Sequence, residues 1–231
     1  MRAGKANAMS ERLLEAIDAV IEEVDDADAL VITGEGKAFS AGLALPELID
    51  LDRDGMLHVI AMLEKAMKRV LTFPRATVAA INGHAIAGGC VLALMCDVRV
   101  MAAGNIGLTE AQLGIGLPSI VVETLRMRVP ATSLGPIALE GRLFAPKEAL
   151  RVGLVDEVVD PSKLESRALE LATRRAAAPL AYAQIKRALL APVLQMWSRK
   201  HEPERDAWLE TWFSEHAQRT LREAVARITK K

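Results

Sequence analysis

The sequence has few of the residues that mark several large classes of protein. It contains two cysteines, four histidines and 3% aromatic residues in a chain of 231 residues. Cys90 and Cys96 fall in one apolar run and match no common metal-ligand spacing, and the histidines are scattered. We therefore expect no metal site, and we expect both thiols to be reduced and buried in a cytoplasmic protein.

Long apolar runs and blocks of one charge are also lacking. The formal net charge is -1, and no basic block stands out, which argues against nucleic acid or a membrane surface as a partner. No apolar run is long enough to span a bilayer, and the first residues lack the apolar centre of a secretion signal. About half of the residues (51%) are apolar, which is typical of a globular protein.

Hydrophobic periodicity predicts an α/β core followed by a helical C-terminal part. Apolar runs indicate strands at residues 29–33, 77–81, 98–102, 106–109 and 153–159. Helical patterns cover residues 10–24, 56–71, 90–95, 118–129, 132–139, 146–152, 163–176 and 180–190, and residues 204–228 in one or two pieces. Ser10 is expected to cap the first of these helices.

The glycine-rich stretch at residues 80–97 (AINGHAIAGGCVLALMCD) is the strongest local signal. It passes from an apolar strand pattern through Gly83, Gly88 and Gly89 into an apolar helical run. Glycines let a ligand approach the backbone closely, and the first amides of a helix favour a negative oxygen. The stretch predicts either an oxyanion site or a plain strand-to-helix turn. Residues 38–45 (AFSAGLAL) offer a second backbone segment of the same kind.

Glu110 is the candidate proton carrier beside such a site. Its neighbours, IGLT before it and AQL after it, are mainly apolar. Burial among apolar groups raises the pKa of a carboxyl and suits it to move protons near neutral pH. The alternative is a solvated carboxylate in a turn, which is the usual place of a glutamate.

Five ordered segments carry a family signature. They are residues 5–9 (KANAM), 38–45 (AFSAGLAL), 82–90 (NGHAIAGGC, followed by Cys96-Asp97), 106–115 (IGLTEAQLGI) and 141–159, which begin with Gly-Arg and end in GLVDEVV. Together they resemble the crotonase superfamily, the enoyl-CoA hydratase/isomerase group. The ordered set covers almost the whole chain and is far more specific than any single motif.

The resemblance implies an α/β fold of the crotonase (ClpP/crotonase-like) type, a spiral of ββα units that form two roughly perpendicular sheets. It implies a spiral core at residues 1–176 and a helical trimerisation region at residues 177–231. The family's N-terminal hairpin before the KxNAL element is expected to be missing, because that element begins at Lys5. The resemblance further implies an acyl-CoA substrate, no separate cofactor, and a homotrimer or hexamer.

By resemblance, the backbone amides of Leu43 and Gly88 hold the thioester oxygen while it gains enolate charge. Substrate contacts are implied for Ala41, Leu43, Leu45 and Gly88, and for Lys5 against the CoA phosphates. Ala44 stands where the family commonly has Asp, so the loop that holds the CoA adenine is expected to differ.

One position separates the reactions of the family. The hydratases use two glutamates, and the first of these positions is Val91 in this chain, while the second is Glu110. One carboxylate is enough to carry a proton from C2 to C4 of an acyl chain, so the resemblance favours a mitochondrial-type Δ3,Δ2-enoyl-CoA isomerase acting in fatty acid β-oxidation. The alternatives are an enoyl-CoA hydratase, decarboxylase or thioesterase, or an inactive CoA-binding scaffold.

Four further positions allow two interpretations each. Ser40 is a possible nucleophile, but it lacks a His/Asp partner pattern. Lys186 fits a CoA phosphate contact or, preferably, a charged helix face. Trp208 and Trp212 are expected in the core or an interface, with contact to an acyl tail as the second option.

Overall fold

Two parallel sheets form the centre of the protein. The computed structural model describes residues 1–4, 6–24 and 26–229. One sheet has the strand order β1-β3-β5-β7 and the other the order β2-β4-β6, and all pairings between these strands are parallel. The strands are β1 (Ala29–Thr33), β2 (Ala38–Ser40), β3 (Ala76–Ile81), β4 (His84–Ile86), β5 (Val98–Met101), β6 (Ile106–Gly107) and β7 (Glu157–Val158). Along the chain, odd-numbered strands thus join the four-stranded sheet and even-numbered strands join the three-stranded sheet. The chain alternates between the two sheets, as expected for a spiral.

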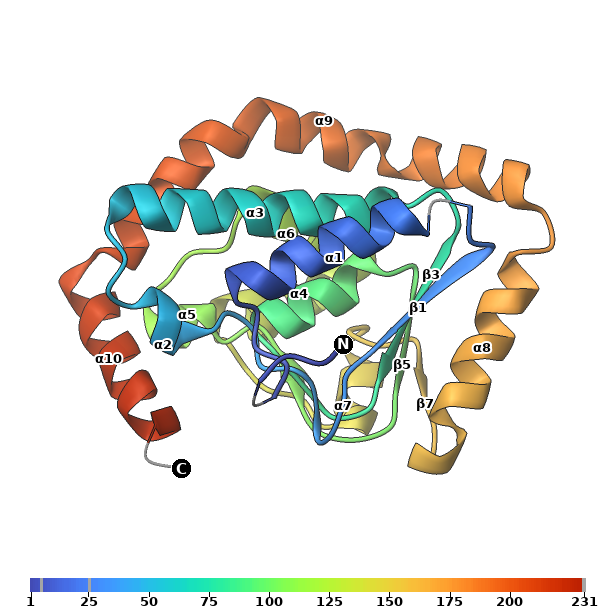
Figure 1. Cartoon of the computed structure of the whole chain (residues 1–231), viewed down its shortest axis with the longest axis horizontal. Helices are drawn as coiled ribbons and strands as arrows, with labels where there is room; N and C mark the ends of the chain where they lie inside the picture. Colours follow the sequence, from blue (N-terminus) through green and yellow to red (C-terminus); the bar gives the residue numbers. More distant parts are fainter. Residues whose placement is uncertain (5, 25, 230–231) are drawn as a thin grey trace.

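Helices enclose both sheets (Figure 1). They are α1 (Glu11–Glu23), α2 (Leu45–Leu48), α3 (Arg53–Thr72), α4 (Gly88–Met95), α5 (Glu110–Leu113), α6 (Ser119–Arg128), α7 (Pro146–Arg151), α8 (Leu164–Arg175), α9 (Pro179–Trp212) and α10 (Glu215–Thr229), with short 3-10 turns at Ala131–Ser133 and Pro161–Lys163 and a π-helical turn at Gly135–Leu139. Helix α8 packs on one face of the four-stranded sheet, while α1, α3 and α4 lie on the other side. The expected α/β core with a helical C-terminal part is confirmed.

The sequence accounts for the central elements directly. Every residue of β3 is buried, as its unbroken apolar run predicts for a parallel strand covered on both faces. Ser10 caps α1 by accepting a hydrogen bond from the Leu13 amide at 3.4 Å. Cys90 and Cys96 are free and buried, as expected. Burial raises the pKa of the Cys96 thiol to about 12.

The predicted strand at residues 153–159 is too long. Only Glu157 and Val158 form β7. The preceding residues turn instead, because Gly153 has a φ of +80° and the Leu154 amide donates back to the Ala149 carbonyl at the end of α7. The apolar run there fills the core rather than a sheet.

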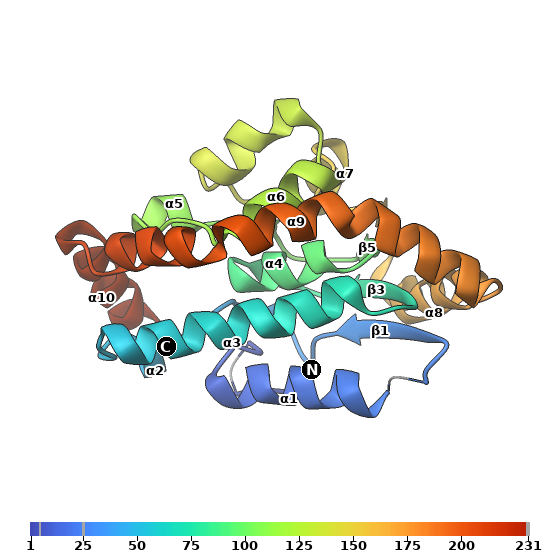
Figure 2. The same ribbon diagram turned by 90° about the horizontal axis from the view of Figure 1, so that it is seen from above.

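Helix α9 differs from the predicted pair of helices at residues 180–190 and 204–228. It runs without a break for 34 residues through Pro192 and Pro203, and the chain turns only at residues 213–214. A proline inside a helix loses a hydrogen bond and strains the preceding turn. Both prolines lie on the exposed side, and the helix is held from beneath by α3 and α6 (Figure 2). Tertiary packing therefore overrides the local signal.

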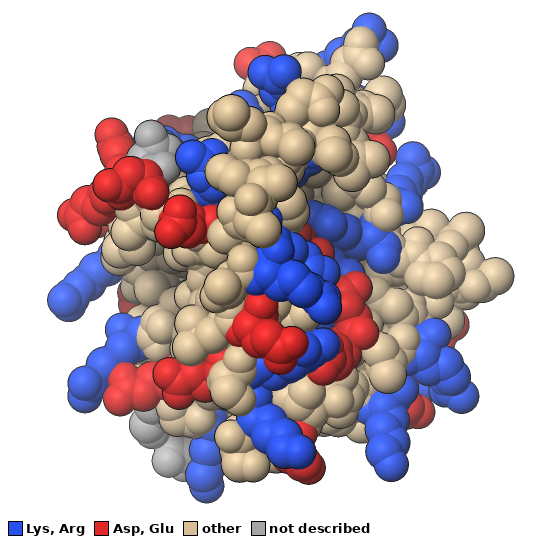
Figure 3. Space-filling view, turned by 90° about the vertical axis from the view of Figure 1, so that its right-hand side faces the viewer, with Lys and Arg blue, Asp and Glu red and all other residues tan. Residues whose placement is uncertain are grey.

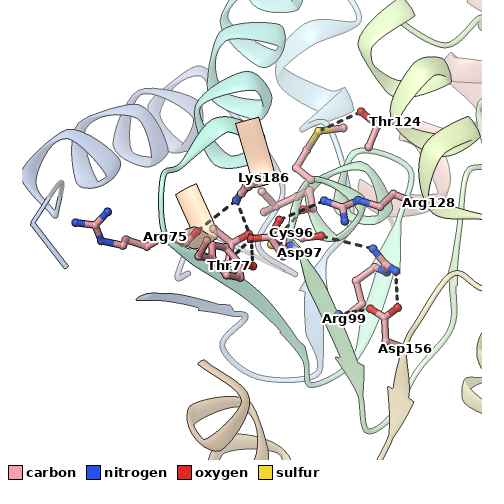
Figure 4. Close-up of polar contacts among 12 residues, drawn as sticks. Arg75, Thr77, Cys96, Asp97, Arg99, Thr124, Arg128, Asp156 and Lys186 are labelled. Atoms are coloured by element: carbon pink, nitrogen blue, oxygen red, sulfur yellow. Dashed lines mark hydrogen bonds and ion pairs between the residues drawn. The ribbon is translucent and has the colours of Figure 1, made fainter. Parts of the chain in front are cut away.

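Asp97, which follows α4, anchors the first half of α9 (Figure 4). Its carboxylate accepts hydrogen bonds from the Tyr182 hydroxyl at 2.9 Å, from Lys186 Nζ at 2.7 Å and from the Thr77 amide at 3.0 Å. Arg128 forms a longer ion pair with it at 3.4 Å. The expectation that Lys186 belongs to a charged helix face is wrong, because Asp97 gives this lysine a buried partner.

The face that carries α8 is mixed in charge. Figure 3 shows basic and acidic side chains interspersed on the face that carries α8, with no field of one sign. Within the part of the chain that the structure describes, no helix combines the length and the hydropathy needed to cross a membrane. The predicted division at residues 176 and 177 stays a prediction; α8 ends at Arg175 and α9 begins at Pro179.

Candidate active site

The loops that follow β2 and β4 meet at one edge of the three-stranded sheet. The two strands are parallel neighbours, with Ser40 paired to Ala85, so their C-terminal ends point the same way. A methyl group added to Gly42 would lie 2.9 Å from the Gly88 nitrogen, and one added to Gly88 would lie 3.6 Å from the Leu43 nitrogen. The amides of Leu43 and Gly88 are therefore close neighbours, as the resemblance predicts.

Both amides are free to bind a ligand. Among the described residues, no backbone or side-chain group accepts a hydrogen bond from the Leu43 or the Gly88 nitrogen. Leu43 lies between the two bonds that tie this loop to Met9, namely Met9 N to Gly42 O at 2.7 Å and Ala44 N to Met9 O at 3.1 Å. Gly88 is the first residue of α4, where amides lack a helical partner and the helix dipole is positive. The pair can donate two hydrogen bonds to one oxygen anion.

The backbone of this region is held in an unusual conformation. Ala87 has a φ of 51°, which is rare for a residue with a side chain. Gly42 has a φ of 83°, and a methyl group at Gly89 would lie 2.2 Å from the Ser40 carbonyl oxygen. Strain of this kind persists only where the surrounding structure enforces it. The glycines in both segments thus serve close packing of backbone against backbone.

Asn7 and Ser40 supply that enforcement. The buried Asn7 amide donates to the carbonyls of Ala38 at 2.8 Å and Glu35 at 3.0 Å. Ser40 Oγ donates to the Asn7 carbonyl at 2.8 Å and accepts from the Gly42 amide at 3.2 Å. Ser40 is thus a fully buried structural residue rather than a nucleophile, and residues 7–9 brace the Leu43 loop.

Glu110 opens the short helix α5 directly after β6, and it faces the same cavity. The cavity has a volume of about 270 Å³ and is lined by Ala41, Leu43, Leu45, Gly88, Val91 and Glu110, among others. The Oε2 atom of Glu110 is buried and has no hydrogen-bond partner in the described structure. Burial raises the pKa of this carboxyl from its ordinary value of 4.5 to about 7.

The structure therefore brings together five of the six predicted site residues. The sixth, Lys5, lies outside the described residues. Val91 lines the cavity at the position where the hydratases carry a second acid, and Glu110 is the one ionisable side chain among the described lining residues. Ala44 precedes α2 and gives it no side-chain cap. The expected change in the loop that holds the CoA adenine stays a prediction.

Sequence reasoning missed most of the cavity wall. The remaining wall comes from four helices and includes Ile60, Leu63, Val121, Trp208, Trp212, Ala224 and Ile228. Trp208 and Trp212 stack with ring centroids 5.4 Å apart and are buried in the core, as expected, and they also line the cavity. Their contact with an acyl tail stays a prediction. Ile60, Leu63 and Val121 follow the same helical period as ordinary core residues, so no signal in the sequence separates them.

The arrangement is suited to proton transfer beside a stabilised oxyanion. It joins one carboxyl with a pKa of about 7 to two free amides, in a wall that is otherwise almost wholly apolar. Within the described residues, no three acidic, histidine or cysteine side chains are placed to hold a metal ion.

Comparison with known proteins gives one consistent family. Residues 1–227 match the family described as Enoyl-CoA hydratase/isomerase. A putative enoyl-CoA hydratase of Thermus thermophilus is 38% identical over 188 residues, which cover 79% of this chain and 74% of that protein. The mouse mitochondrial enoyl-CoA delta isomerase 1 is 34% identical over 190 residues, 78% of this chain and 64% of its own length. The crystal structure of human mitochondrial delta3-delta2-enoyl-CoA isomerase superposes with a TM-score of 0.92 at 26% identity, covering 100% of this chain and 92% of that one.

Proposed function

The chain belongs to the enoyl-CoA hydratase/isomerase family, and we propose that within this family it is a Δ3,Δ2-enoyl-CoA isomerase. The superposition with a family member confirms the expected crotonase fold. The observation that carries the isomerase proposal is the cavity itself, where Glu110 is the one ionisable side chain among the described lining residues and Val91 lines the wall in place of a second acid.

The proposed reaction needs one base and no water. The Glu110 carboxylate takes a proton from C2 of a 3-enoyl-CoA, and the electrons of that C–H bond move into a dienolate. The Leu43 and Gly88 amides hold the thioester oxygen, where the negative charge collects; one such donor contributes roughly a hundredfold or more to the rate. The protonated Glu110 then delivers the same proton to C4, which leaves the double bond between C2 and C3.

Hydration of a 2-enoyl-CoA is the second candidate, because the Thermus relative bears the name of a hydratase. Addition of water requires one group to activate the water and another to supply a proton. Val91 can do neither. We therefore expect weak or no hydration by the natural chain.

The assembly state and the cellular setting remain proposals. Ile185 and Leu189 lie one helical turn apart on α9 and are each more than half exposed, which gives this helix an apolar patch suited to contact between copies. We propose a homotrimer or hexamer, measurable by light scattering during size-exclusion chromatography, in the cytoplasm and with a role in fatty acid β-oxidation.

The decisive experiment is product analysis with a set of 3-enoyl-CoAs and with crotonyl-CoA. We expect the trans-2-enoyl-CoA to form from the former, and little 3-hydroxyacyl-CoA from the latter. Glu110→Gln should lower isomerase turnover by roughly 10²–10⁴-fold, in a variant that stays folded and is no less stable than the wild type. Glu165→Gln, the same change on the exposed side of α8, is the matched control and should keep full activity. Wild-type rates in Glu110→Gln would remove the proposal, and tight acyl-CoA binding without any turnover would favour the scaffold.

A further inference from the structure

The cavity beside Glu110 is open on one side and closed on the other. Ala41 and Ile228 are exposed residues of its wall. Five other residues of the wall are buried, each of them 5% exposed or less. They come from helices α3, α6 and α9, which form the top layer in Figure 1, and they are Ile60, Leu63, Val121, Trp208 and Trp212. A ligand that enters from solvent must end against this buried group.

The wall is also uniform in its chemistry. Beyond Thr109, Glu110 and the indole nitrogens of Trp208 and Trp212, every lining side chain is a hydrocarbon or absent. The Trp212 nitrogen is buried and has no hydrogen-bond partner in the described structure. A hydroxyl carried into such a wall could accept one bond from an indole N–H but would leave its own proton without an acceptor, and a carboxylate would lose its water for one donor at most. Both losses are costly. A straight hydrocarbon chain loses nothing of this kind and gains from burial.

The size of the cavity limits the length of the acyl chain that it can hold. A methylene group takes about as much room as a water molecule, and at about 30 Å³ for each, a cavity of about 270 Å³ holds about nine such groups. The closed side is rigid, because the stacked indoles and the α3 side chains are part of the close-packed core.

We infer that this cavity selects straight, unsubstituted acyl chains of medium length, and that Leu63 of α3, together with the stacked Trp208 and Trp212, sets the upper limit of chain length. The inference rests on the proposed function only in taking an acyl thioester of CoA as the ligand. It adds which thioesters are bound and which residues make the choice.

Calorimetric titration with saturated acyl-CoAs, from butanoyl to hexadecanoyl, tests this without any turnover. Affinity should rise about fourfold for each added methylene. The rise should stop at about nine carbons, where the cavity is full. A chain of the same length with a terminal hydroxyl should bind at least tenfold more weakly than the unsubstituted one.

Two leucines of α3 provide a matched pair of variants. Leu63 lines the cavity, whereas Leu71 is equally buried in the core and does not. Leu63→Ala should extend the rise in affinity by about three carbons, the number of carbon atoms that the change removes. Leu71→Ala removes the same core packing, but it should not change the chain length at which the affinity stops rising.

Val121→Leu gives an independent test that keeps the core filled, since it adds one methylene to the closed side and should shorten the limit by about one carbon. An unchanged limit in both Leu63→Ala and Val121→Leu would overturn the inference, as would equal affinity for the hydroxylated chain. If Leu63→Ala does not fold, Val121→Leu decides alone. Failure to bind any acyl-CoA would overturn the proposed function as well, whereas binding without isomerisation would leave the chain-length inference standing and remove only the isomerase.

Discussion

Glu110 and Asp97 are two carboxylates in sheltered positions with opposite surroundings. Asp97 is met by the Thr77 amide, the Tyr182 hydroxyl, Lys186 and Arg128. Glu110 has a buried oxygen with no partner among the described residues. The first carboxylate joins α9 to the sheet, and the second lines a cavity. The same chemical group thus stabilises the fold where its charge is matched, and is available for proton transfer where its charge is left unmatched.

The largest effect on stability should come from removing the charge of Asp97, which makes this carboxylate position resemble an unpaired site. Asp97→Asn would leave Lys186 buried without a counter-ion, and burial already lowers the pKa of this lysine. We expect a loss of about 3–5 kcal/mol in the free energy of unfolding, measured by urea titration. The activity of the molecules that remain folded should not change.

A second substitution checks the cause of that loss. Adding Lys186→Met to Asp97→Asn removes the unpaired charge and should recover part of the lost stability. The exposed pair of Glu148 and Arg151 gives the control, because Glu148→Gln should cost less than about 1 kcal/mol. Equal effects of Asp97→Asn and Glu148→Gln would contradict the role given to Asp97.

Removing the charge of Glu110 should do the reverse and stabilise the fold. The pKa of Glu110 is about 7 in the folded protein and about 4.5 in the unfolded chain, so between these values the folded state binds more protons. Ionisation of Glu110 therefore lowers the free energy of unfolding as pH rises from 4.5 to 7, by about 3 kcal/mol in total once pH exceeds 7. Urea titrations of Glu110→Gln and wild type should differ by this amount at pH 8 and agree at pH 4. A less stable variant at pH 8 would show that Glu110 is held by partners, as Asp97 is.

The amide pair can be disturbed without touching the carboxyl. Gly42→Ala would place a methyl group 2.9 Å from the Gly88 nitrogen, so the isomerase kcat should fall about a hundredfold. Gly36→Ala is the matched control, since Gly36 has a similar φ of 77° and open space around it. Both variants should lose about 1–3 kcal/mol of stability through backbone strain, but only Gly42→Ala should lose catalysis. Equal kcat values for the two variants would show that these amides take no part in the reaction.

The smallest expected effect is the pH profile. Proton abstraction needs ionised Glu110, so kcat/KM for isomerisation should rise about tenfold for each pH unit below 7 and level off above it. Stopped assays with one 3-enoyl-CoA between pH 5 and pH 9 measure this. A profile that is already flat at pH 5 would mean that the carboxyl is matched in charge.

The comparison also shows how far sequence reasoning reaches. The glycine segments and the apolar neighbours of Glu110 indicate an oxyanion site and a carboxyl of raised pKa as one of two interpretations each. Only the family resemblance assigns the two amides to Leu43 and Gly88 and the proton transfer to Glu110. The α/β core was predictable because its hydrophobic periodicity depends on residues close in sequence.

What escaped prediction depends on contacts between distant segments. Leu63 and Leu71 share one helical pattern, and the packing of several distant segments decides that only Leu63 lines the cavity. Lys186 has the sequence context of a surface lysine and is buried because Asp97 lies 2.7 Å away. Pro192 and Pro203 read as helix breaks, yet α9 continues through them because α3 and α6 support it from below.

The carboxyl, both amides and the wall residues of α9 and α10 all come from one polypeptide. This has a genetic consequence for any assembly of copies. Two defective alleles, one changed at Glu110 and one at Gly42, cannot rescue each other when expressed together, since no subunit in the mixture carries an intact set. Activity in a mixed population should instead follow the fraction of normal chains in direct proportion.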